Sequence, residues 1–162
     1  MNLNKLKSRK QEKRVAKEIN GRTTPASGAI WSAKADVRND LFLIECKTTE
    51  KNYYDLTFSV WDKIYREAIK DGMRIPVMCI DLNNGRTQLV VLRIDDLGTY
   101  PCPPFTEKCY MRKTLSRKRI HSEFPVDRFI LEKDNKPYHL VVIPYSDFIA
   151  EIIPYYAKEY IK

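Results

Sequence analysis

One short apolar run, residues 41–48, constrains the fold of this chain more than any other segment. Its sequence, LFLIECKT, is far too short for a membrane span and is typical of a strand buried on both faces of a sheet. Near its end stand Glu45 and Lys47, which are two residues apart and therefore project from the same face of a strand. Burying two charges in an apolar layer is costly. We therefore expect compensation, either by a mutual ion pair or by a metal ion together with a phosphate.

The remaining pattern predicts helices and hairpins around this strand. Apolar residues at helical spacing, with each run ended by a glycine, predict two amphipathic helices: residues 4–20 and 55–71. Apolar runs separated by turn residues predict strands in two hairpins: residues 30–37 with 41–48, and 76–81 with 88–94. The order of these elements predicts an α/β fold with a mixed central sheet and both helices packed against it.

We divide the chain into three parts that pack as one domain: residues 1–97, 98–127 and 128–162. The middle part is basic and contains prolines, and we expect it to be an irregular insertion. The last part predicts a hairpin followed by a helix at 146–161, which Pro154 interrupts. Residues 77–97 and 128–148 share a pattern of strand, turn, strand and Asp-apolar, through chance or through duplication.

The charge balance favours a polyanionic partner. Lys and Arg number 29 against 21 Asp and Glu, a net charge of +8, which favours nucleic acid over a membrane surface. The cations concentrate at residues 5–17 and 108–119, and we expect the second run to face solvent, either to bind nucleic acid or as a solvated surface. No apolar run could span a membrane, the N-terminus has no signal-like core, and the four cysteines are too few for a disulfide scaffold. A reducing, cytoplasmic location is the expectation.

The predicted first hairpin brings Asp36 back beside Glu45 and Lys47. Two carboxylates and an ammonium would then converge near a sheet edge. Oxygen ligands of this kind suit Mg²⁺, which takes one or two carboxylates plus water and substrate phosphate. The alternative for Glu45 and Lys47 alone is a structural ion pair, since Glu-x-Lys is a common tripeptide.

Several separate pieces of the sequence occur in an order that resembles a known family. The pieces are QEKRVAK at 11–17, Gly21, PASGA at 25–29, ADV at 35–37 and IECKTT at 44–49. Together they resemble the PD-(D/E)xK nuclease core, and most closely the Holliday junction resolvases of archaeal type and their phage relatives. The similarity covers about residues 8–95, with Ala35 standing where the motif name has proline. It implies a restriction-endonuclease-like sheet and a host that is bacterial, archaeal or phage-infected.

The resemblance also implies a catalytic site. Carried over residue by residue, it makes Glu12, Asp36 and Glu45 metal ligands with the main-chain carbonyl of Cys46, and makes Lys47 the catalytic lysine. The implied cofactor is Mg²⁺, for which Mn²⁺ would substitute. Two other acidic residues compete for these positions, Glu18 for the helix position and Asp40 for the hairpin position. We favour Glu12, because it shares a helical stripe with the apolar residues expected to face the sheet.

The implied activity is a metal-dependent, structure-selective DNA endonuclease, most closely a Holliday junction resolvase. A nuclease acting on another DNA substrate and a non-catalytic DNA-binding module on the same fold remain alternatives. The expected partners are branched or duplex DNA and a second copy of the chain, because a junction with two-fold symmetry calls for a symmetric dimer. The residues expected to contact DNA are Arg22, Ser27, Lys34, Thr48, Lys51, Lys113, Arg117, Lys118 and Arg119.

Overall fold

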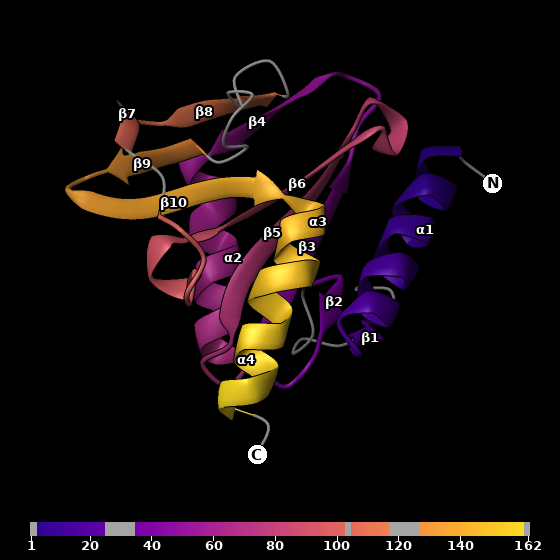
Figure 1. The fold of residues 1–162 in the computed structure, drawn as a ribbon. Helices are drawn as coiled ribbons and strands as arrows, with labels where there is room; N and C mark the ends of the chain where they lie inside the picture. The colour runs from indigo at the N-terminus through magenta and orange to yellow at the C-terminus, as the bar shows by residue number, and fades with distance from the viewer. Residues whose placement is uncertain (1–2, 25–34, 103–104, 117–126, 161–162) are drawn as a thin grey trace.

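The computed structural model describes residues 3–24, 35–102, 105–116 and 127–160 (Figure 1). The fold is α/β, with a mixed and largely antiparallel central sheet flanked by helices. In sheet order the eight strands are β1 (Arg22–Thr23), β2 (Val37–Arg38), β3 (Phe42–Thr48), β5 (Ile75–Leu82), β6 (Thr87–Arg93), β10 (Lys136–Pro144), β9 (Asp127–Lys133) and β7 (Phe105–Cys109). Only the β3–β5 and β7–β9 pairs are parallel within this sheet of the described residues.

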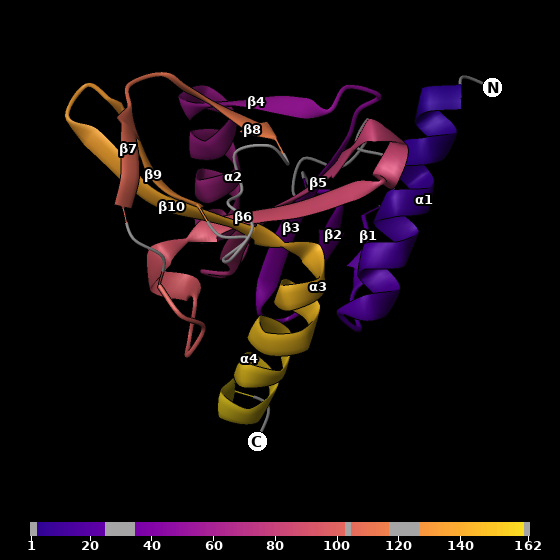
Figure 2. The same cartoon turned by 45° about the horizontal axis from the view of Figure 1, so that its top comes forward.

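Each face of the sheet is covered by other elements (Figure 2) and has its own hydrophobic core. One face packs against α1 (Leu3–Glu18) and the C-terminal helical segments α3 (Tyr145–Asp147), η4 (Phe148–Ile152) and α4 (Ile153–Tyr160). The other face packs against α2 (Phe58–Lys70) and a small sheet formed by β4 (Tyr53–Thr57) and β8 (Arg112–Ser116). Alternate residues of each central strand therefore enter different cores.

The predicted helix at 4–20 is confirmed as α1. Val15 and Ala16 are buried against the sheet, and the chain turns at Gly21, whose N–H donates to Ala16 O at 2.8 Å. A Cβ at Gly21 would lie 2.7 Å from Arg38 O, so only glycine lets α1 end this close to β2. This approach fixes where α1 lies relative to the hairpin.

The predicted helix at 55–71 begins later than expected. Residues Tyr53–Thr57 form β4, and α2 starts at Phe58 with Thr57 as its N-cap. The reason is long-range: β4 pairs antiparallel with β8, placing Tyr53 opposite Ser116. A strand partner so distant in the chain leaves no trace in the local pattern.

The expectation of an irregular insertion at 98–127 is wrong for its described part. Residues Phe105–Cys109 form β7 along β9, and residues Arg112–Ser116 form β8 along β4. The insertion thus links the large sheet to the small one. Residues 117–126 lie outside the described part of the chain.

The similarity between residues 77–97 and 128–148 corresponds to two similar hairpins, β5–β6 and β9–β10. Their inner strands, β6 and β10, pair antiparallel, and Val91 lies opposite Val142, its counterpart in the sequence pattern. Asn84 and Asn135 both have positive φ, but the turns differ in length: four residues separate Leu82 from Thr87, and two separate Lys133 from Lys136. The sequence similarity therefore corresponds to a symmetric β6–β10 pairing, while the two hairpins differ in register and turn length.

The predicted C-terminal helix is present as α3, η4 and α4 in succession, with Pro154 in the first turn of α4. Proline cannot donate a main-chain hydrogen bond, and it follows the π-helical turn η4, in which the Ile153 N–H donates to Phe148 O, so the regular helical pattern is interrupted here. No helix among the described residues is long and apolar enough to cross a membrane.

Candidate active site

Glu45 and Lys47 lie on the same face of β3, as the alternation predicted. The Lys47 Nζ donates to Glu45 Oε1 at 2.6 Å, and Glu45 is only 9% exposed. Two residues earlier on the same face, Leu43 packs with Ala68 of α2. The charged pair therefore lies on the α2 side of the sheet, at the C-terminal end of β3.

The first hairpin brings Asp36 to this strand, as expected. Val37 lies opposite Ile44 in the β2–β3 register, which places Asp36 opposite Glu45. Asp36 Oδ2 accepts a hydrogen bond from the Cys46 main-chain N–H at 2.8 Å. This bond fixes the carboxylate on the strand that carries Glu45 and Lys47. Residues 30–34 of the predicted first strand lie outside the described residues.

The surroundings of Asp36 disfavour its charged form. Burial and then the nearby charges of Glu45 and Glu12 raise the pKa of Asp36 to about 6, against the opposing effects of the Cys46 N–H and the Lys47 charge. Burial lowers the pKa of Lys47, but its bond to Glu45 together with the charges of Glu45 and Asp36 outweighs burial, so the net pKa is raised. Lys47 is therefore a stable cation, and Asp36 is poised to hold either a proton or a metal.

Glu12 lies within electrostatic reach of Asp36, although the buried stripe of α1 is one residue out of phase with our expectation. Gln11 is the buried residue, at 3% exposed, whereas Glu12 is half-buried and accepts a bond from Ser8 Oγ at 3.2 Å. Glu18 is exposed, 4.0 Å from Arg14, and accepts a bond from the Tyr145 hydroxyl. The geometry keeps Glu12, and not Glu18, beside the site.

Two residues near the site were not anticipated. Gln11 Nε2 donates to the main-chain oxygens of Lys47 at 3.1 Å and Cys79 at 3.2 Å, holding β3 and β5 together under α1. Tyr54 on β4 interacts electrostatically with Lys47 and Glu45, and burial raises its pKa. The position of Tyr54 depends on strand pairing with a distant segment, which the local sequence does not indicate. Gln11 could have been found, because a residue four positions before the buried Val15 lies on the same face of the helix.

The donor set at this site suits a hard cation. Among the described residues, no three or more His, Cys, Asp or Glu side chains are grouped as a preformed metal site. Mg²⁺ does not require such a group, because it is commonly held by one or two carboxylates with water and substrate phosphate. Asp36 and Glu45 are two mutually repelling carboxylates in a partly buried setting, so a cation between them would relieve that repulsion. The residues present therefore fit Mg²⁺.

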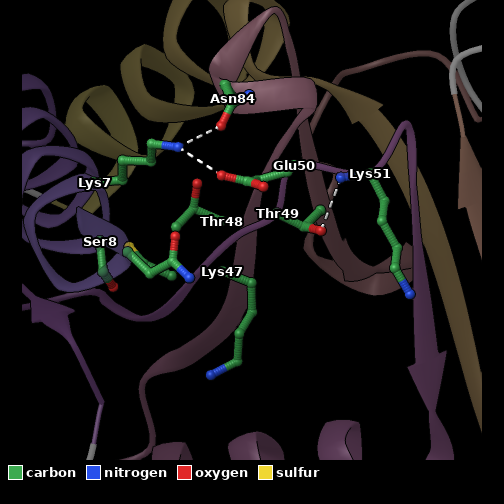
Figure 3. A pocket seen from close by; sticks show the side chains of 10 residues that line it. Lys7, Ser8, Lys47, Thr48, Thr49, Glu50, Lys51 and Asn84 are labelled. Atoms are coloured by element: carbon green, nitrogen blue, oxygen red, sulfur yellow. Dashed lines mark hydrogen bonds and ion pairs between the residues drawn. The ribbon is translucent and has the colours of Figure 1, made fainter. Parts of the chain in front are cut away.

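A hollow of about 500 Å³ borders the site at the end of β3 (Figure 3). Thr48 and Lys51, both expected to contact DNA, line it together with Lys47. Across from them, Lys7 of α1 donates to Glu50 Oε1 at 2.9 Å and to Asn84 Oδ1 at 2.8 Å. Segments from α1, the end of β3 and the turn after β5 thus enclose one polar hollow beside the candidate catalytic residues.

Lys113 does not face solvent, which corrects our expectation for the basic run. It is 3% exposed, lies 2.9 Å from Asp127 Oδ2 and also pairs with Glu107. Its side chain enters the space between the two sheets because alternate residues of β8 point inward. Arg22 is exposed on β1, as a DNA contact must be. The other expected contacts, Ser27, Lys34, Arg117, Lys118 and Arg119, lie outside the described residues.

Comparison with known proteins adds no relative to this picture: no family model matches the sequence, and a search of curated proteins finds no match. The geometry of Asp36, Glu45 and Lys47 is thus the main evidence on function. It defines a partly buried cluster of two carboxylates and a lysine at a strand end, next to a polar hollow that Lys47 also lines.

Proposed function

We propose that this protein is a metal-dependent, structure-selective DNA endonuclease of the Holliday junction resolvase type, built on a restriction-endonuclease-like fold. One observation carries the proposal: Lys47 contacts Glu45, and Asp36 is bonded to the amide between them. A structural ion pair would need only Glu45 and Lys47. It gives no reason for a second, half-buried carboxylate whose pKa is raised by burial and by Glu45.

Asp36, Glu45 and the Cys46 carbonyl would hold Mg²⁺, and Glu12 would bind a second ion or a coordinated water. When bound, Mg²⁺ polarises the scissile phosphate and lowers the pKa of a water molecule. Lys47 leaves Glu45 and donates to the phosphate or to the attacking water, stabilising the charge that develops at phosphorus. Gln11 donates to the Lys47 main-chain oxygen and keeps the main chain fixed while the Lys47 side chain moves.

The surface next to the site carries the charge that a DNA partner requires. The helix α1, which holds Glu12, also presents exposed cations: Lys5, Arg9, Lys10, Lys13 and Lys17. Such a row suits contact with phosphates irrespective of base sequence. A four-way junction has two-fold symmetry, so paired cuts call for a symmetric dimer of this chain.

The test is a cleavage assay on labelled four-way junction, duplex and single-stranded DNA, with Mg²⁺ and with EDTA. We expect symmetric cuts in the junction, with Mg²⁺ only. Preferential cleavage of duplex or single strands would instead assign the site to another DNA substrate. Binding without cleavage of any DNA would indicate a non-catalytic DNA-binding module, and absence of both would refute the proposal.

A further inference from the structure

The hollow beside the site has the chemistry of an anion site. Among the described residues that line it, three are cationic, Lys7, Lys47 and Lys51, and one is acidic, Glu50. The remaining polar lining residues supply neutral hydroxyl and amide groups: Asn4, Ser8, Thr48, Thr49 and Asn84. Because Lys47 Nζ is paired with Glu45 outside the lining, Lys7 and Lys51 against Glu50 leave a small net positive charge beside many uncharged hydrogen-bonding groups, which suits a phosphate.

The lining also indicates which part of a nucleic acid fits. No aromatic side chain is present among the described lining residues, so no platform is available on which a base could stack. Charged and hydroxyl groups serve contacts to phosphate and sugar, which carry no sequence information. The hollow is thus suited to the backbone rather than to base recognition.

Lys7 compensates the negative charge of Glu50 in the hollow (Figure 3). In the free protein, Lys7 Nζ is shared between Glu50 Oε1 and Asn84 Oδ1. The Glu50 side chain is 66% exposed, and exposed ion pairs of this kind contribute little to stability. A phosphate entering the hollow can therefore take Lys7 from Glu50 at small cost.

We propose that the hollow binds the backbone phosphate next to the scissile one, and that Glu50 competes with this phosphate for Lys7. The inference rests on the proposed function, because Lys47 borders both the catalytic cluster and the hollow. In the absence of DNA the Glu50 carboxylate pairs with Lys7, and a bound DNA phosphate displaces it. It thus weakens binding of any polyanion that does not reach the end of β3.

The first experiment compares Glu50→Gln with Glu132→Gln, measuring affinity for four-way junction and duplex DNA in EDTA. Glu132 is a matched control, because it also pairs with a lysine, Lys108, at 2.7 Å but lies on β9 away from the hollow. Both variants raise the net charge equally. We expect Glu50→Gln to bind about two- to fivefold tighter, the range of an exposed ion pair, and Glu132→Gln to bind less than twofold tighter. Equal gains in the two variants would overturn the proposal, since net charge alone would explain them.

The second experiment replaces Lys7 by Gln, with Lys108→Gln as its control. Losing one phosphate contact should weaken binding about three- to tenfold and lower the slope of log affinity against log salt by about 0.9 on duplex arms. Glu50→Gln should then have no larger effect in the Lys7→Gln background than Glu132→Gln has. An unchanged effect of Glu50→Gln there would refute competition for Lys7.

These binding measurements separate the two proposals. If the unmodified protein binds none of the DNA substrates, the proposed function fails together with this inference. If it binds and cleaves DNA but both hollow variants behave like their controls, only the assignment of the hollow fails.

Discussion

At the scale of single residues, the site depends on three side chains that the chain places within a few ångströms of one strand. Asp36 is bonded to the Cys46 amide, and Lys47 to Glu45. Each of these contacts has a separate role in the proposed reaction, since carboxylates hold the cation and the lysine acts on the phosphate. Substitutions at these positions should therefore affect chemistry far more than binding.

Lys47→Ala and Asp36→Asn should each abolish Mg²⁺-dependent cleavage while retaining most DNA affinity, because affinity comes from many phosphate contacts elsewhere. Cleavage is measured in Mg²⁺ and binding by gel shift in Ca²⁺. Asp40→Asn is the control, because Asp40 is an exposed residue of the same hairpin. Undiminished cleavage in either variant would remove that residue from the mechanism.

The raised pKa of Asp36, about 6, predicts a pH-dependent stability without metal. The folded protein binds this proton more tightly than the unfolded chain does. The resulting stabilisation is complete below pH 4, falls as the pH rises, and is lost above pH 6, a loss of at most about 3 kcal/mol. Asp36→Asn should remove this decline and raise the Tm in EDTA at pH 7–8. Parallel Tm profiles for both proteins from pH 4 to pH 8 would contradict this assignment.

At the scale of elements, α1 and the β3–β5 pair decide where the site lies. Gln11 bridges Lys47 O and Cys79 O, and Arg14 Nη2 donates to Asp81 Oδ1 at 3.0 Å. These polar contacts run along the helix and fix its rotation about its own axis. The rotation in turn determines which acidic residue of α1 approaches Asp36.

Glu12→Gln should therefore impair cleavage at least tenfold more than Glu18→Gln does. Glu12 interacts with Asp36, whereas Glu18 contacts Arg14 and Tyr145 away from the site. The measurement is the single-turnover cleavage rate in Mg²⁺ at saturating DNA, with far-UV circular dichroism to check folding. The reverse order of effects would show that α1 is rotated differently about its axis in the DNA complex, with Glu18 rather than Glu12 near Asp36.

At the scale of the whole molecule, the insertion at 98–127 joins the two sheets. Its strands β7 and β8 belong to different sheets. The buried Lys113 of β8 pairs with Glu107 of β7 and Asp127 of β9, and so connects the small sheet to the large one. Lys113 also lies 5.5 Å from the ring centre of Phe129 in the core. Its charge serves the fold and is not available to DNA.

Lys113→Ala should destabilise the protein by about 3 kcal/mol, because it removes the cation that pairs with the buried Asp127. The adjacent Arg112→Ala is the control, because the Arg112 side chain is 64% exposed and should cost less than about 1 kcal/mol. Urea unfolding measures both. The slope of log DNA affinity against log salt should not change when Lys113 is replaced in the folded protein. A reduced slope for Lys113→Ala alone would show that Lys113 contacts a phosphate.

The sequence by itself determined the elements whose signals are local. Helical spacing located α1, an apolar run located β3, and the alternation of side chains put Glu45 and Lys47 on one face. The short turn after Val37 made the approach of Asp36 to this strand predictable as well. These features depend on residues close together in the chain, so the pattern contains them.

Only the tertiary structure decided features that depend on distant pairing. Tyr53–Thr57 became a strand because Arg112–Ser116 lies beside it, and the same pairing turned Lys113 inward to its two carboxylates. The hollow likewise needs Lys7, Lys51 and Asn84, which come from three separate segments. A local pattern specifies periodicity, but it cannot specify which partner covers a face, and burial of a charge depends on that partner.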